Sequence, residues 1–187
     1  GEEPPCPGSW RSLEGGGGWW LGDELLLLAE PPLPPAVAAL PALGAVEAEL
    51  WRMRRGEPAW PQEINDAFNP FELGLADRVS LSKGCYLGQE TLAKLASGDG
   101  VKQQLRRWHA IPELGMDTPL EPGTPLQTSE GERAGQITSS LSLADGSRVG
   151  LAMVRRSALA SATLLAAEGE SRVPVRLSRP QIGRAHV

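Results

Sequence analysis

Residues 83–90 read Lys-Gly-Cys-Tyr-Leu-Gly-Gln-Glu, and a helical pattern over residues 88–96 begins inside this stretch. Gly84 and Gly88 flank a short turn, where a positive φ or a close approach of the backbone suits glycine. Helices often begin directly after such a turn. The stretch therefore predicts a tight turn that places Cys85 just before the first turn of a helix.

Cys85 is the candidate reactive residue of this stretch. A single cysteine often has only a packing role, since cysteine is among the most buried residue types. Here Lys83 lies two residues away, and the free N–H groups of the coming helix lie close by, so both favour a thiolate. A thiolate is a nucleophile and a metal ligand. A functional thiol and an inert packed cysteine are the two interpretations.

Upstream of this stretch, successive segments differ in composition and in hydrophobic periodicity. Residues 1–18 are rich in proline and glycine and predict loop. The apolar run 19–29 predicts a buried strand. Residues 45–55 predict the best helix of the chain, with acids early and arginines late, as the helix dipole favours. Residues 57–70 form a proline-rich loop of a length that often carries function.

Downstream, short apolar segments alternate with turn residues, and Ser97 to Gly100 marks the boundary between the two patterns. Such spacing predicts a small antiparallel barrel or sandwich over residues 101–178. The expected strands are 101–111, 124–128, 133–140, 148–155, 162–167 and 172–177.

Composition narrows the function classes. The 187 residues carry a net charge of −5, so the chain has no general basic field for nucleic acid or an anionic membrane. Two cysteines are too few for a disulfide framework and favour a reducing compartment, with the cytoplasm as the default. No metal site is readable around His109, which lacks Cys or His partners nearby in the sequence.

The stretch 83–90 resembles the Lys-Gly-Cys-Tyr-x-Gly-Gln-Glu signature of YgfZ-type proteins, which are relatives of the glycine-cleavage T-protein. Residues 52–58 are similar to the family's Arg-hydrophobic-x-x-Gly-x-Pro segment, and residues 135–139 resemble its Gly-x-hydrophobic-Thr-Ser barrel strand. The resemblance implies a functional role for the signature residues Lys83, Gly84, Cys85, Tyr86, Gly88, Gln89 and Glu90.

The resemblance also implies an α+β fold, in which a partial ferredoxin-like and helical folate-binding domain over residues 19–97 precedes the C-terminal barrel over 101–178. The cofactor would be tetrahydrofolate or a derivative. Glu24 lies where the T-protein has a pterin-contacting glutamate, and Arg52 is assigned with it to the folate site. The T-protein's folate-contacting arginine falls at Ala48, a departure that weakens the aminomethyltransferase interpretation.

Three functions stay open on this reading. The first is a tetrahydrofolate-binding accessory protein that supports iron–sulfur cluster assembly or repair, and through it tRNA modification, with iron–sulfur proteins or their assembly factors as partners. The second is an aminomethyltransferase, against which the Cys85 motif argues. The third is an interaction module without folate. Whether the protein is an enzyme stays undecided, and direct contact with nucleic acid or membrane is not expected.

The two ends of the sequence carry expectations of their own. Residue 1 is Gly, so we expect a fragment that lacks the first subdomain of the family's fold. Residues 182–187, which include His186, resemble a translated sequencing adapter and are expected to pack against nothing. Cys6 has no motif around it and receives no role.

Overall fold

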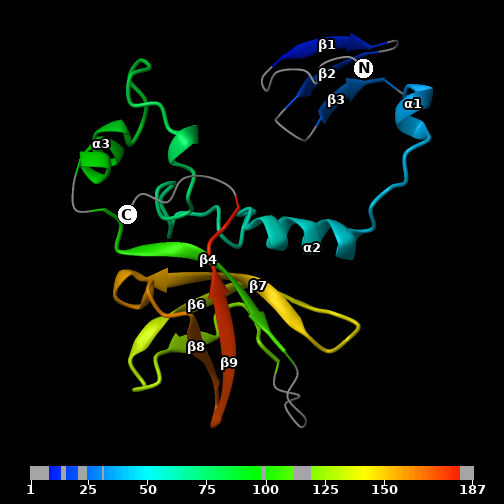
Figure 1. Cartoon of the computed structure of the whole chain (residues 1–187). Helices are drawn as coiled ribbons and strands as arrows, with labels where there is room; N and C mark the ends of the chain where they lie inside the picture. The colour runs from blue at the N-terminus through cyan, green and yellow to red at the C-terminus, as the bar shows by residue number, and fades with distance from the viewer. Residues whose placement is uncertain are drawn as a thin grey trace. The chain divides into compact units, whose positions relative to one another are not determined.

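The computed structural model describes residues 9–13, 16–20, 25–30, 32–97, 100–111 and 119–181. The chain divides into two compact units, Gly1–Gly44 and Ala45–Val187. Figure 1 labels most of their helices and strands. The division falls at Gly44, whereas the sequence predicted a boundary at the turn over residues 97–100. Residues 182–187, with the adapter-like sequence, lie outside the described part.

The first unit contains a three-stranded antiparallel sheet in the order β1-β2-β3, followed by a short helix. The strands are β1 (Trp10–Leu13), β2 (Gly16–Trp20) and β3 (Leu25–Ala29), and the helix is α1 (Pro35–Ala38). The expectation of loop over residues 1–18 is thus wrong for the strands within it. The run 19–29 likewise contains the end of one strand and the whole of the next.

Glycines in β2 allow this small sheet to form. Trp10 and Trp19 are paired across β1 and β2, and their rings meet edge to face with centroids 6.1 Å apart. A Cβ atom on Gly17 would lie 2.0 Å from the Trp10 ring, so only glycine fits there. A glycine run, which favours loop by composition, here provides the space for an aromatic side chain.

The second unit begins with α2 (Ala45–Arg55), the helix that the sequence predicted with these bounds. Met53 on its inner face is 4% exposed and joins a core cluster with Leu73, Leu105, Leu151 and Met153. Val46, near the start of the helix, is 57% exposed. The helix therefore packs through its C-terminal half, against β6 and β7 (Figure 1).

Turns connect α2 to the signature stretch. A cluster of turns follows Gly56, and the 3-10 helix η1 spans Ala76–Arg78. The helix α3 (Gln89–Ser97) then begins inside the signature, as predicted. Its only ion pair among the described residues is the exposed i,i+4 contact of Glu90 with Lys94, at 2.9 Å.

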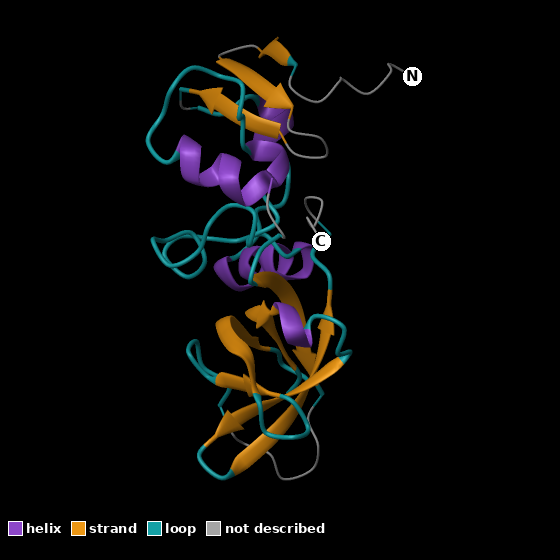
Figure 2. Ribbon diagram, turned by 90° about the vertical axis from the view of Figure 1, so that its left-hand side faces the viewer, coloured by secondary structure: helices purple, strands orange, loops and turns teal. Residues whose placement is uncertain are grey.

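A closed antiparallel barrel completes the unit, in the order β4-β7-β6-β5-β8-β9, and it confirms the predicted C-terminal barrel. Figure 2 shows these strands curving around a common interior. Their bounds are Gln103–Ala110 (β4), Pro125–Gln127 (β5), Arg133–Ser142 (β6), Arg148–Arg155 (β7), Thr163–Glu168 (β8) and Ser171–Ser178 (β9), with the 3-10 helix η2 at Arg156–Ala158.

Trp108 is the largest fully buried side chain of the barrel, with 2% exposure. Its indole Nε1–H donates to the carbonyl oxygens of Ser139 and Leu151, at 3.2 and 3.1 Å. A Cβ atom on Gly150 would lie 1.9 Å from the Ser139 oxygen and 2.7 Å from the Trp108 indole nitrogen. Glycine at 150 therefore lets β7 approach both β6 and the tryptophan ring.

Among the described residues, no helix has both the length and the apolar character needed to cross a membrane.

Candidate functional site

The signature residues lie in one turn that is cross-linked by its own polar groups. The Lys83 amide donates to Oγ of Ser80 at 3.1 Å, and the Tyr86 hydroxyl donates to the Ser80 carbonyl at 2.9 Å. Nε2 of Gln89 reaches back to the carbonyl of Leu81 at 3.0 Å. These bonds hold the backbone on both sides of Cys85, so the turn has a defined shape although it lies on the surface.

Gly88 lets the chain turn from this loop into α3. Its φ is +85°, a backbone conformation that disfavours residues with a Cβ, and its carbonyl accepts the Leu92 amide at 3.0 Å as the helix starts. A Cβ on Gly84 would meet open space among the described residues. Backbone geometry thus explains why residue 88 is a glycine. No steric contact within the described part of the chain requires a glycine at residue 84.

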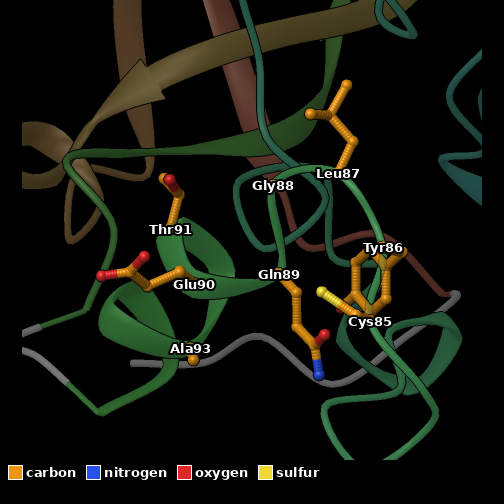
Figure 3. A pocket seen from close by; sticks show the side chains of 8 residues that line it. All are labelled: Cys85, Tyr86, Leu87, Gly88, Gln89, Glu90, Thr91 and Ala93. Atoms are coloured by element: carbon orange, nitrogen blue, oxygen red, sulfur yellow. The ribbon is translucent and has the colours of Figure 1, made fainter.

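Cys85 is a free, exposed thiol. Residues 85–91 together with Ala93 line a surface hollow of about 800 Å³. In Figure 3 the Cys85 and Gln89 side chains extend to one side of the backbone and Leu87 to the other. The Cys85 side chain is therefore not packed in a core made by the described residues. The thiol is open to small molecules or to another protein.

Lys83 and Tyr86 form a second contact within the turn. The Lys83 ammonium lies 5.0 Å from the centroid of the Tyr86 ring, within the range of a cation–π interaction. This contact places a positive charge on the turn that carries the thiol. A negatively charged or electron-rich group that approaches Cys85 would therefore meet a favourable charge.

Arg52 does not line this hollow and belongs to a separate network. It contacts Glu63 at 3.3 Å, the Glu57 carbonyl at 2.7 Å and Oγ of Ser139 at 3.1 Å. It also pairs with the more exposed Glu49 at 2.9 Å. These partners come from α2, the following turns and β6. The structure thus gives the Arg52 guanidinium a structural role, and its predicted contact with folate stays a prediction.

Glu63 lies at the centre of this network and was not singled out from the sequence. Its side chain is fully buried, accepts from Oγ of Ser139 at 2.6 Å and from the Ala59 amide at 3.0 Å, and faces Arg52. Glutamate is almost never fully buried unless it is paired. The one available signal was its place five residues after the segment 52–58, which resembles a segment of the family.

Burial and charge also affect two titratable groups in the barrel. Burial, with a smaller effect of the nearby Arg179 cation, lowers the pKa of the Arg106 guanidinium. At the β6–β7 turn, hydrogen bonds from the Ser147 hydroxyl and amide lower the pKa of Asp145. Neither residue lines the hollow at Cys85.

Other predicted residues cannot be placed. Glu24, Cys6 and His186 lie outside the described residues. Within the described part of the chain, no group of three or more His, Cys, Asp or Glu side chains is arranged to hold a metal ion. The structure therefore brings together Lys83 to Glu90 as one site and leaves Arg52 apart from it.

Three comparisons with known proteins agree with this architecture. Residues 105–183 match the family described as the CAF17 C-terminal β-barrel domain. An Arabidopsis thaliana protein, named as a putative chloroplastic transferase, is 36% identical over 152 residues, which cover 81% of this chain and 33% of that protein. Glycine cleavage system aminomethyltransferase T from Bartonella henselae has a TM-score of 0.57 at 18% identity, over 72% of this chain and 37% of that one.

Fold and barrel together define the class, an α+β chain with the C-terminal barrel of T-protein-like folds. The barrel matches the CAF17 C-terminal β-barrel domain, in agreement with the YgfZ-type resemblance of residues 83–90. The chain spans about a third of the length of the plant and bacterial proteins that it matches.

Proposed function

We propose that this chain is part of a tetrahydrofolate-binding accessory protein that supports assembly or repair of iron–sulfur proteins, and through them tRNA modification. The observation that carries the proposal is the exposed Cys85 thiol, held in a cross-linked turn beside a hollow of about 800 Å³. We propose folate as the ligand because the sequence resembles that of T-protein relatives. Iron–sulfur proteins or their assembly factors are the proposed partners, in a reducing compartment such as the cytoplasm.

The chemistry proposed for the turn is that of an accessible thiol. A thiolate can act as a nucleophile or as a ligand for a soft metal ion, so it suits transient contact with a cluster or with a cysteine of a client protein. The Lys83 ammonium on the same turn would attract an anionic group that approaches the thiol. Tyr86 and Gln89 fix the backbone around Cys85 through their bonds to Ser80 and Leu81.

An aminomethyltransferase is the second candidate, because the bacterial protein with the similar fold is named as one. At 18% identity this likeness shows the fold alone. Ala48 stands where the T-protein has a folate-contacting arginine, and Cys85 belongs to a signature that the T-protein lacks. We therefore rank the accessory function above the transferase. A third candidate, an interaction module without folate, shares the barrel but predicts no folate binding.

A folate titration separates the three candidates. Tetrahydrofolate is titrated into an intact YgfZ-type homologue and into the 187-residue chain, with quenching of tryptophan fluorescence as the signal. The accessory function predicts saturable binding to the intact homologue with no methylenetetrahydrofolate formed from an aminomethylated carrier protein. Formation of that product would establish the transferase. Absence of saturable binding would leave the interaction module.

A further inference from the structure

A second, smaller cavity lies in the Ala45–Val187 unit, away from the signature turn. It has a volume of about 150 Å³ and lies between the C-terminal end of α2 and strands β4, β7 and β9. Pockets for drug-sized ligands typically measure ~300–1,000 Å³. Only a compact group fits here. Four of the residues that line the cavity are polar: Arg54, Arg107, His109 and Ser178.

The guanidinium of Arg107 has a hydrogen-bond partner for Nη1 and none for Nε among the described residues. Nη1 donates to the Arg54 carbonyl, which fixes the side chain against the end of α2. Nε is buried and has no hydrogen-bond partner within the described residues. Nε and Nη2 form the side of a guanidinium that binds an oxyanion through two parallel hydrogen bonds. Leaving the buried N–H of a cation without an acceptor costs free energy. The unpaired Nε–H therefore suggests that a bound ligand supplies the acceptor.

The charges around the cavity point to an anion. Arg54 and His109 share the lining with Arg107, and no carboxylate contributes to it among the described residues. Arg176 of β9 lies opposite His109 of β4 in the strand register. Asp145 is close enough for His109 to lower its pKa, but its carboxylate already accepts from Ser147. Two arginines, Arg54 and Arg107, thus line the cavity on a chain whose net charge is −5.

We propose that this cavity binds a tetrahedral oxyanion of the phosphate type, held by the Nε and Nη2 edge of Arg107 with Arg54, His109 and Ser178 around it. Arginine suits this role because its planar fork matches the oxygen spacing of phosphate. The site does not depend on folate or on Cys85. The ligand is either free phosphate or a phosphate group of a larger molecule whose remainder stays outside the cavity.

The test is a titration of the 187-residue chain with inorganic phosphate, followed by the Nε–Hε NMR signal of Arg107. That signal is assigned by its loss in Arg107→Lys. We expect phosphate and sulfate to shift it saturably, and acetate and chloride at equal ionic strength to leave it in place. No shift with phosphate, an equal shift with chloride, or a stronger shift with acetate would overturn the proposal.

Two variants give an independent readout through the backbone amides of His109 and Ser178. Arg107→Lys keeps the charge but removes the fork, and we expect phosphate affinity to fall about tenfold. Arg133→Lys is the matched control, because Arg133 is an exposed arginine at the start of β6. We expect its affinity to equal that of the wild type. Unchanged affinity in Arg107→Lys, or an equal loss in both variants, would contradict the site. If Arg107→Lys fails to fold, the wild-type titration is read from the backbone amides of His109 and Ser178, whose assignment does not need the variant.

Discussion

The phenolic hydroxyl of Tyr86 joins the two ends of the signature turn through its bond to the Ser80 carbonyl. Tyr86→Phe removes this bond and keeps the ring beneath Lys83. We expect the free energy of local opening to fall by about 1 kcal/mol, so amides of residues 81–86 should exchange about fivefold faster. Hydrogen exchange measures this change. Ser82→Ala, two residues from the clamp, is the control, and equal exchange in the two variants would contradict the clamp.

Arg52 and Glu63 make a second residue-scale prediction. Arg52→Met leaves the fully buried Glu63 carboxylate without its cation and should lower the free energy of unfolding by about 3 kcal/mol or more. Glu49→Gln removes only the exposed partner of the same arginine and should cost less than about 1 kcal/mol. Urea denaturation of both variants compares the two costs. Equal costs would mean that the buried contacts of Arg52 add no more to the free energy of unfolding than a surface ion pair does.

At the scale of elements, the β6–β7 turn depends on the ionised form of Asp145. Its carboxylate accepts from the Ser147 amide at 2.9 Å and from the Ser147 hydroxyl at 2.6 Å. These bonds, with a smaller effect of His109, lower the pKa of Asp145 in the folded state. The ionised Asp145 carboxylate therefore stabilises the folded state fully above its unfolded-state pKa of ~3.9. This stabilisation is lost as the pH falls through the folded-state pKa.

Asp145→Asn tests this dependence. The variant should be less stable than the wild type at pH 7, and the difference in unfolding midpoint should shrink as the pH falls below about 4. Thermal unfolding followed by circular dichroism at several pH values measures it. A difference that stays constant with pH would show that the charge of Asp145 does not matter for the turn.

Elements differ in how well the sequence predicted them. The barrel strands and α2 were predicted because their apolar periods and breakers are local signals, as in Val149 to Val154. The hairpin of β1 and β2 was missed because its glycines act by making room for Trp10, a contact between strands that composition does not reveal. Glu63 was missed for a related reason, since its partners Arg52 and Ser139 are distant in sequence.

At the scale of the whole molecule, the chain consists of a small sheet unit and a larger unit that carries both the signature turn and the barrel. We expect residues 45–187 to fold without residues 1–44, because the core clusters around Trp108 and Met53 lie wholly within the larger unit. Near-ultraviolet circular dichroism and the urea midpoint of the shortened chain measure this independence. Loss of the Trp108 signal would show that the barrel needs the first unit.

The proposed function requires Cys85 to act as an exposed thiol at a fixed place. Its most direct test is Cys85→Ser in an intact YgfZ-type homologue, read out as the activity of an iron–sulfur enzyme and the level of tRNA thiolation in cells that lack their own copy. Serine keeps the shape but is a far poorer nucleophile and metal ligand.

We expect the Cys85→Ser variant to fold with wild-type stability and to lose the accessory activity. We also predict that moving the thiol by three residues, in Ser82→Cys with Cys85→Ser, does not restore it. Wild-type enzyme activity and tRNA thiolation in Cys85→Ser would contradict the central claim.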